Sequence, residues 1–137
     1  MPVICRNARF EHHGKQEISL EQAMSLSVDF ADADYEMLTL TGAWARERYI
    51  KIQQLHEGVQ SIYSMRGHSS HQFNPFFALK RKNTTEDIGE VIGFSLVYSG
   101  NFLGQVNVDT FQVARAMIGI HPEGFSWTLK KGETFQT

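Results

Sequence analysis

Apolar and polar residues alternate with a period of two along most of this chain, which is the pattern of strands with one buried face. The longest such series covers residues 18–30, where six of the seven even-numbered positions are apolar. Residues 21–24 are also good helix formers, but the period-two series is longer than the helical one. We therefore predict one long strand over residues 18–30.

Further alternating segments are separated by turn signals rich in Gly, Pro, Asp and Asn. They predict strands over residues 35–41, 46–53, 59–66, 76–82, 89–99, 102–108, 111–120, 125–130 and 133–137. Residues 67–74 form a polar loop that ends in Asn-Pro, and residues 83–87 form a second polar loop. Nine or ten short strands at this spacing, with no helix, predict an all-β fold, an antiparallel β-sandwich.

Three of these strands carry a prediction about burial. Ile50 and Ile52 share one face of the strand over 46–53, which is typical of a half-buried strand. The strand over 89–99 is apolar on both faces, so we expect both to be covered. Trp127 shares one face of its strand with Phe125 and Leu129, which predicts that it lies in the core.

The length of 137 residues bounds the domain content. It suits one domain and excludes a whole (β/α)₈ catalytic barrel, which needs about 250 residues. The first expected strand starts near Met1 and the last hairpin stops at Thr137, whereas natural domains usually end in a loose tail. We therefore predict a partial sandwich domain over 1–137, truncated at both ends.

The net charge and the cysteine content limit the classes of partner and the cellular compartment that we expect for this protein. A formal net charge of −2 argues against a nucleic-acid binder, which needs a basic face. The single cysteine, Cys5, favours a reducing compartment. No segment has the length of a membrane helix, and no signal peptide is visible. We expect a cytoplasmic protein with no nucleic-acid or membrane partner.

The histidines suggest a metal site only weakly. His68 and His71 are separated by two serines, but zinc needs a third and a fourth ligand. His12, His13 and His121 would serve only if the fold brought them there. A serine nucleophile in the same loop would need an orienting group and an oxyanion hole, and nothing in the sequence marks either. We expect no metal and no cofactor.

The acidic residues carry no recognisable catalytic pair. Asp29, Asp32 and Asp34 lack the glycine and the terminal glutamate of a calcium loop, so we interpret them as turn-forming aspartates. Glycoside hydrolysis needs two carboxylates on either side of one bond, and no motif marks such a pair among the fifteen acids. Asn83-Thr84-Thr85 is a glycosylation sequon, meaningful only in a secreted protein.

Trp44 and the following Arg46-Glu47-Arg48 have two readings. Aromatic rings pack on the apolar faces of sugars and bidentate polar groups bind sugar hydroxyls, so this segment is a candidate sugar site. Alternating charges on an exposed strand produce the same pattern, and that reading is the simpler one.

Several long segments together resemble one family. They are Thr41–Arg48, Arg66–Phe76, Gly89–Phe102, Phe125–Leu129 and Gly132–Thr137. In this order they resemble the N-terminal β-supersandwich domain of the bacterial α-galactosidases of glycoside hydrolase family 36. Two turns depart from the family pattern, at His121-Pro122 and at Lys131-Gly132.

The resemblance implies a retaining enzyme that removes terminal non-reducing α-galactose from raffinose, melibiose and stachyose. It implies a central (β/α)₈ barrel that holds both catalytic aspartates, and no position here matches their motifs. The fragment is therefore expected to be inactive alone, and no residue in it is assigned a catalytic role. Its implied role is packing and oligomerisation, with the barrel of the same parent chain and further copies of the enzyme as partners.

We select Trp44, Arg46, His71 and Asn74 as candidate contacts with substrate, another domain or another subunit. Two other functions stay open. A free-standing carbohydrate-binding sandwich requires an exposed tryptophan in a groove, for which Trp44 is the better candidate. A pure oligomerisation module requires an exposed apolar face and no response to sugar.

Overall fold

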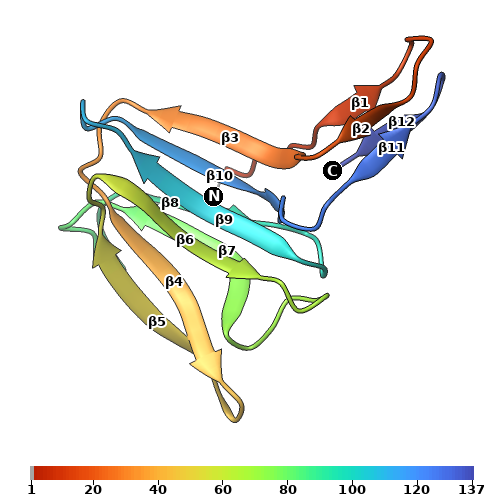
Figure 1. The fold of residues 1–137 in the computed structure, drawn as a ribbon. Helices are drawn as coiled ribbons and strands as arrows, with labels where there is room; N and C mark the ends of the chain where they lie inside the picture. The colour runs from red at the N-terminus through yellow and green to blue at the C-terminus, as the bar shows by residue number, and fades with distance from the viewer. Residues whose placement is uncertain (1) are drawn as a thin grey trace.

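The computed structural model describes residues 2–137, and every regular element within them is a strand (Figure 1). The strands are β1 (Arg9–Glu11), β2 (Ile18–Leu20), β3 (Met24–Phe30), β4 (Glu36–Ala43), β5 (Arg46–Gln54), β6 (Gly58–Ser64), β7 (Phe73–Lys80), β8 (Val91–Ser95), β9 (Phe102–Val108), β10 (Ala114–Ile120), β11 (Trp127–Leu129) and β12 (Thr134–Gln136). The described residues contain no helix long and apolar enough to cross a membrane.

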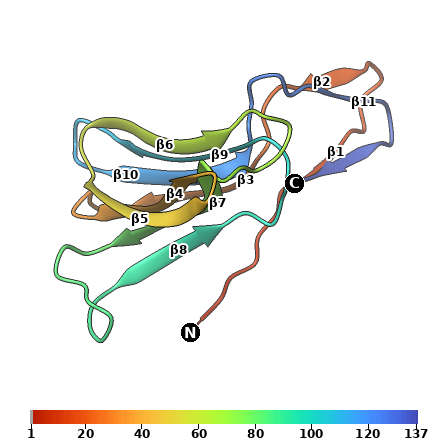
Figure 2. The ribbon, with the colours of Figure 1, turned by 90° about the horizontal axis from the view of Figure 1, so that it is seen from below.

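Two four-stranded antiparallel sheets form the sandwich. The β9 sheet has the order β3-β10-β9-β6, and the β4 sheet has the order β5-β4-β7-β8. The two sheets lie one above the other in Figure 2. The predicted all-β antiparallel sandwich is therefore confirmed, and every strand pair in it is antiparallel.

The core lies between the two sheets because each sheet turns one apolar face inward. Phe77 and Leu79 on β7 and Phe102 and Val106 on β9 have no exposed side-chain surface. The ring of Phe77 stacks on that of Phe94, with centroids 4.6 Å apart. Gly104 on β9 leaves room for this packing, since a methyl group there would lie 3.1 Å from the ring of Phe77.

The remaining four strands form an arm that projects from one end of the sandwich (Figure 1). In the arm β1 pairs with β12 and β2 pairs with β11. The ring of Phe135 is central to this arm, with ring centroids of Phe10, Phe125 and Trp127 between 5.3 and 6.4 Å away. Two ribbons of three-residue strands are too short to stand alone, so this aromatic cluster supplies their packing.

The single strand predicted over 18–30 is wrong, because the chain divides there into β2 and β3. A bend at Glu21 separates them, and Ala23 beyond it is buried. The hydroxyl of Ser19 donates to the Glu21 carboxylate at 2.6 Å and lies 2.8 Å from the hydroxyl of Ser126. These polar contacts direct β2 into the arm, whereas β3 remains in the β9 sheet.

Several other boundaries differ from prediction. The strand over 102–108 is confirmed, but the one expected from residue 111 begins at Ala114, after a turn in which the Asp109 carboxylate accepts from two backbone N–H groups. The predicted loop over 67–74 ends two residues early, so Asn74 and Pro75 belong to β7. Proline is tolerated there because the register of β7 is irregular between Phe73 and Phe77.

Two of the predicted burial patterns are wrong because β5 and β8 are the edge strands of the β4 sheet. All residues of β5 are exposed, including Ile50 and Ile52. In β8 only Phe94 is buried, whereas Val91 and, beyond the strand, Val97 are exposed. No second layer lies over the outer side of this sheet within the described residues.

The predicted core position of Trp127 is also wrong. Its side chain is 49% exposed, because β11 belongs to the arm and not to the sandwich. Leu129, two residues further along the same strand, is buried. The alternation on this strand therefore predicted the strand correctly, but not the layer that would cover it.

Candidate functional site

The candidate residue Trp44 lies at the tip of the hairpin between β4 and β5. Ala43 pairs with Arg46, so Trp44 and Ala45 form a two-residue turn. Ala45 adopts a left-handed backbone conformation with a φ of 63°, which is uncommon for a residue with a side chain. The turn presents Trp44 to solvent, where its side chain is 84% exposed.

Gly42 shapes the base of this tip. The register slips between Thr41 and Ala43, which leaves an extra residue on β5, and Arg48 there has a φ of 61°. A methyl group on Gly42 would lie 2.5 Å from the carbonyl oxygen of Arg46 and 2.7 Å from the Cα of Glu47. Only glycine therefore fits at this point of the hairpin.

The loop before β7 packs against the same tip. The backbone N–H of Gly42 donates to the carbonyl oxygen of Gln72 at 3.2 Å, and the carbonyl oxygen of His71 lies 3.2 Å from where a Gly42 methyl would stand. The Gln72 side chain accepts from the guanidinium of Arg66 at 3.1 Å. His71 is exposed, and Asn74 is half-buried at the start of β7.

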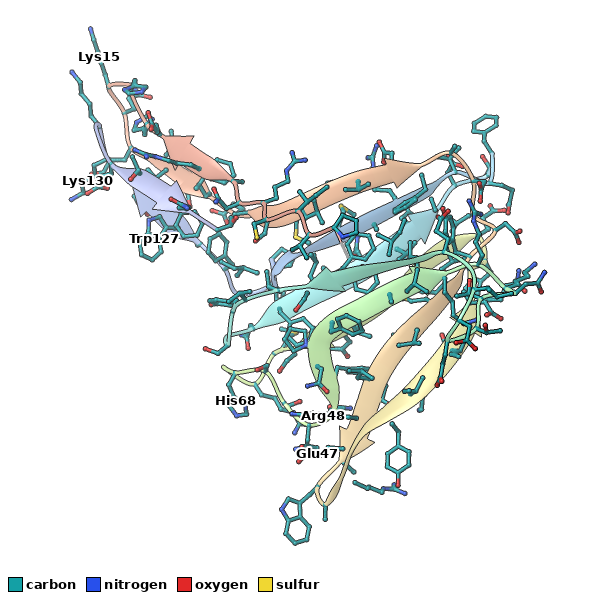
Figure 3. The ribbon with its side chains drawn as sticks, turned by 180° about the vertical axis from the view of Figure 1, so that it is seen from behind. Lys15, Glu47, Arg48, His68, Trp127 and Lys130 are labelled. Atoms are coloured by element: carbon teal, nitrogen blue, oxygen red, sulfur yellow. The ribbon has the colours of Figure 1, made fainter. Side chains whose placement is uncertain are left out.

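The structure thus brings Trp44, Arg46, His71 and Asn74 to one end of the β4 sheet. Arg46 enters no ion pair within residues 2–137, so its charge is available to another molecule. Figure 3 shows the neighbouring Glu47 and Arg48 at this end of the molecule, with His68 on the loop, far from the arm.

The sequence reasoning missed Gly42 as the residue that positions this cluster. The available signal was a glycine inside an alternating strand pattern, which indicates a bulge or a close backbone approach. The bulge itself gives Arg48 its left-handed backbone. An unfavourable backbone conformation of this kind persists only where the surrounding structure enforces it.

The three aspartates considered for calcium are each held by a cation. Asp29 binds Arg115 at 2.6 Å, Asp32 binds Arg81 at 2.6 Å and Asp34 lies 3.0 Å from the Lys82 ammonium. The hydrogen bond from Arg115 lowers the pKa of Asp29, and that from Arg81 lowers the pKa of Asp32. The predicted turn role is confirmed for Asp32, whose carboxylate accepts from the Asp34 backbone N–H at 2.9 Å.

The histidines do not lie together in one site. His12 lies in the arm, where its Nε2 is 2.6 Å from the Gln16 carbonyl oxygen. His121 is buried after β10 and its Nδ1 accepts from the Glu123 backbone N–H at 3.1 Å. Within residues 2–137 no three His, Cys, Asp or Glu side chains are grouped so that they could hold a metal ion.

Two small cavities among residues 2–137 are lined by neither Trp44 nor Trp127. One, of about 190 Å³, lies beside the turn that contains His121 and Glu123. The other, of about 130 Å³, opens between the β4–β5 ribbon and β6. Its wall includes Gln60, whose Nε2 donates to the Gln54 carbonyl oxygen at 3.0 Å while its buried Oε1 has no partner in the described chain.

Comparison with known proteins gives one consistent result. The family described as the glycosyl hydrolase family 36 N-terminal domain matches residues 1–130. The α-galactosidase AgaA of Geobacillus stearothermophilus is 56% identical over 135 residues, which are 98% of this chain and 18% of that protein. The α-galactosidase 1 of Pediococcus pentosaceus is 42% identical over 136 residues, 99% of this chain and 19% of that protein.

Solved structures agree with the sequences. The crystal structure of AgaA superposes with a TM-score of 0.92 at 55% identity, over 93% of this chain and 18% of that one. Variants of AgaA were crystallised with raffinose and with stachyose. An α-galactosidase from Lactobacillus brevis also superposes with a TM-score of 0.92, at 44% identity, over 93% of this chain and 17% of that one. The chain thus spans about a fifth of the length of the relatives it matches.

Proposed function

This chain belongs to the glycosyl hydrolase family 36 N-terminal domain family, and on that basis we propose that it is the N-terminal region of an α-galactosidase. The parent enzyme would hydrolyse terminal α-D-galactosides such as raffinose, melibiose and stachyose. The observation that carries this proposal is the 56% identity to AgaA over nearly the whole chain, since AgaA variants were crystallised with raffinose and with stachyose.

Within the parent enzyme this region is proposed to be non-catalytic. A retaining glycosidase needs a nucleophilic carboxylate and a second carboxyl group, about 5–5.5 Å away, with a raised pKa that lets it act as an acid. Asp29 and Asp32 have lowered pKa values because arginines hydrogen-bond them. Glu36 is bound by the Lys80 ammonium at 2.5 Å. These three carboxylates are therefore poor candidates for the acid.

The proposed role of the tip residues Trp44, Arg46, His71 and Asn74 is contact with substrate or with a neighbouring domain or subunit. An exposed indole ring matches the apolar face of a sugar, and a guanidinium or an amide matches its hydroxyl rim. The tight turn and the bulge at Gly42 hold this tip in a fixed position. A backbone segment whose position is already defined loses little entropy on contact, which favours such a role.

Location and assembly are further parts of the proposal. We place the parent enzyme in the cytoplasm, in keeping with a single, exposed and unbridged Cys5. We further propose a homo-oligomer, in which the exposed tip that carries Trp44 is a candidate contact with a neighbouring subunit. A mass measurement of the native protein tests the compartment, because secretion would allow a glycan on the exposed Asn83.

The experiment that tests the function is hydrolysis of a chromogenic α-galactoside by the parent enzyme and by the isolated chain. We expect turnover by the parent, strict preference for α- over β-galactosides, and no turnover by the isolated chain above background. Turnover by the isolated chain would contradict the non-catalytic role. Absence of turnover by the folded parent would contradict the assignment as an α-galactosidase.

A further inference from the structure

The loop between β6 and β7, residues 65–72, is held at both of its ends by hydrogen bonds to other parts of the chain. It contains no regular structure and is exposed, apart from the half-buried Ser69 and Ser70. An exposed segment of this kind is ordinarily among the more mobile parts of a protein. The hydrogen bonds at its two ends therefore determine its shape.

The first end is bound to the connection between β8 and β9. The side-chain oxygen of Asn101 accepts from the backbone N–H of Gly67 at 2.6 Å. The backbone N–H of Ser69 donates to the carbonyl oxygen of Ser99 at 2.8 Å. Gly67 has a φ of 81°, a left-handed conformation that favours glycine. These contacts fix residues 67–69 against the segment that leads into β9.

The second end of the loop is bound to the tip that carries Trp44. The carbonyl oxygen of Gln72 accepts from the backbone N–H of Gly42 at 3.2 Å, and its own N–H donates to the Ser70 hydroxyl at 3.2 Å. The side-chain oxygen of Gln72 accepts from the guanidinium of Arg66 at 3.1 Å. Three groups of Gln72 are thus engaged, and the backbone of the hairpin two residues before Trp44 depends on where Gln72 lies.

These contacts lie outside the core. Arg66 and Gln72 are exposed, and Asn101 is half-buried. Arg66 enters no ion pair within residues 2–137. Hydrogen bonds at such positions add little net stability, because water competes for the same groups. Their contribution is therefore to geometry, since they connect the start of β9 to the tip of the β4–β5 hairpin through one loop.

We propose that Asn101 and Arg66 are positioning residues for Trp44. Asn101 holds the loop, Arg66 holds Gln72 within it, and Gln72 holds the hairpin backbone. This inference rests on the proposed function, because it gives the tip its contact with substrate or with a neighbouring domain or subunit. Misplacement of a contact by about 1 Å is enough to lower a rate strongly, so a residue that holds the backbone affects activity without touching the substrate.

The first test is the activity of the parent enzyme. Asn101→Ala removes the acceptor for Gly67, whereas Asn101→Asp keeps an oxygen in its place. We expect Asn101→Ala to lower kcat/KM for a chromogenic α-galactoside about threefold to fivefold and Asn101→Asp to stay within about twofold of the parent sequence. Asn107→Ala, at an exposed position of β9, is the matched control and should change nothing. Full kcat/KM in Asn101→Ala, where Trp44→Ala lowers it, would overturn the proposal.

A double-mutant cycle separates positioning from a general loss of structure. A residue that acts through Trp44 has little further effect once the indole has been removed. We expect Asn101→Ala to lower kcat/KM by less than about 1.5-fold in the Trp44→Ala background. The same loss in both backgrounds would contradict the proposal, because a merely structural defect acts independently of Trp44.

Amide hydrogen exchange of the folded parent enzyme gives a readout that needs no activity. In Asn101→Ala and in Arg66→Ala, we expect exchange over residues 41–47 to be at least about threefold faster, because the N–H of Gly42 loses its fixed acceptor. Exchange over residues 102–108 should stay unchanged. Arg66→Lys keeps a donor for Gln72 and should restore most of the protection. Unchanged exchange over residues 41–47 in both alanine variants would overturn the proposal.

Together the measurements distinguish a failure of this inference from a failure of the proposed function. Faster exchange over residues 41–47, in an enzyme whose kcat/KM is indifferent to Trp44→Ala, would contradict the contact role of the tip and leave the positioning intact. A lowered kcat/KM in Trp44→Ala, with exchange and activity unchanged in Asn101→Ala and Arg66→Ala, would contradict the positioning alone. A folded parent without turnover would contradict the activity, and the exchange measurement would still decide the positioning.

Discussion

The guanidinium of Arg81 binds both carboxylate oxygens of Asp32, at 2.6 and 3.2 Å, across the end of the β4 sheet. It also donates to the carbonyl oxygen of Asp34 at 3.1 Å and lies 3.8 Å from the ring centroid of Tyr35. The phenol of Tyr35 in turn donates to the carboxylate of Glu90. One arginine therefore joins the turn before β4 to the end of β7.

This pairing gives the fold a defined response to acid. The Arg81 hydrogen bond lowers the pKa of Asp32 below its ordinary 3.8 in the folded state. The resulting stabilisation is complete above that ordinary value and is lost as the pH falls through the lowered one. We expect the free energy of unfolding, measured by urea titration, to fall as the pH drops below about 4.

Asp32→Asn should reduce stability at pH 7 and flatten the response below pH 4. Glu86→Gln is the control, because Glu86 is exposed and enters no ion pair within residues 2–137. An acid response in Asp32→Asn as steep as that of the parent sequence would show that other groups govern it, with Asp29 the first to examine.

Gly42→Ala should destabilise the hairpin that presents Trp44. The new methyl group would meet backbone atoms of Arg46 and Glu47 at 2.5 and 2.7 Å, and backbone cannot move aside as a flexible side chain does. We expect a loss of about 1–3 kcal/mol, the usual cost of overpacking.

Gly93→Ala is the matched control for this substitution. Its methyl group would make an ordinary contact of 3.4 Å with the ring of Phe76, so we expect little change in chemical denaturation. Equal losses in the two variants would argue against the close approach at Gly42 as the cause.

Phe77→Ala should cost about 3–5 kcal/mol, because it removes a fully buried ring and leaves a cavity between the sheets. Phe111→Ala, which truncates an exposed phenylalanine, should stay within about 0.5 kcal/mol of the parent sequence. Thermal and urea unfolding of both variants measure the difference. A small loss for Phe77→Ala would place the core elsewhere.

Trp44→Ala in the parent enzyme tests the proposed role of the tip. We expect about a tenfold lower kcat/KM for an α-galactoside, equal to about 1.4 kcal/mol, with an unchanged melting temperature. Trp127→Ala should lower the melting temperature and leave kcat/KM unchanged, since this ring packs on Phe135 in the arm. If Trp44→Ala keeps full kcat/KM, Trp44 contacts neither the substrate nor the neighbouring part that shapes its site.

The isolated chain should self-associate as its concentration rises, because apolar side chains on one side of the β4 sheet, among them Ile50 and Ile52, are exposed. The edge strands β5 and β8 of that sheet are also unpaired on their outer edges within the described residues. Light scattering across a concentration series measures this directly. Ile50→Lys with Ile52→Lys should shift the mass toward that of one chain. A strictly monomeric mass at high concentration would count against the open face.

Sequence alone predicted much of the fold. Period-two alternation located the strand over 102–108 correctly, because β9 lies in the middle of a sheet with one face on the core. Turn residues marked most of the connections. The fold class and the family resemblance both agree with the structure and with the comparisons.

Burial was predicted less well, for a physical reason. Alternation shows that a strand has two unlike faces, but it does not show which layer covers each face. Ile50, Ile52 and Trp127 were apolar residues on regular strands, and all three are exposed. The break at Glu21 was equally invisible, because side-chain hydrogen bonds to distant Ser126 help direct β2 into the arm.

For the candidate site, too, the sequence predicted the residue types but not their arrangement in space. The residue types in the sequence were enough to select Trp44, Arg46, His71 and Asn74 as a group, although nothing in their spacing showed that they would lie at the same end of one sheet. The tertiary structure decided that, because a bulge at Gly42 and one backbone hydrogen bond to Gln72 join two segments some thirty residues apart. Local sequence determines strands and turns, whereas register and long-range packing decide which residues become neighbours.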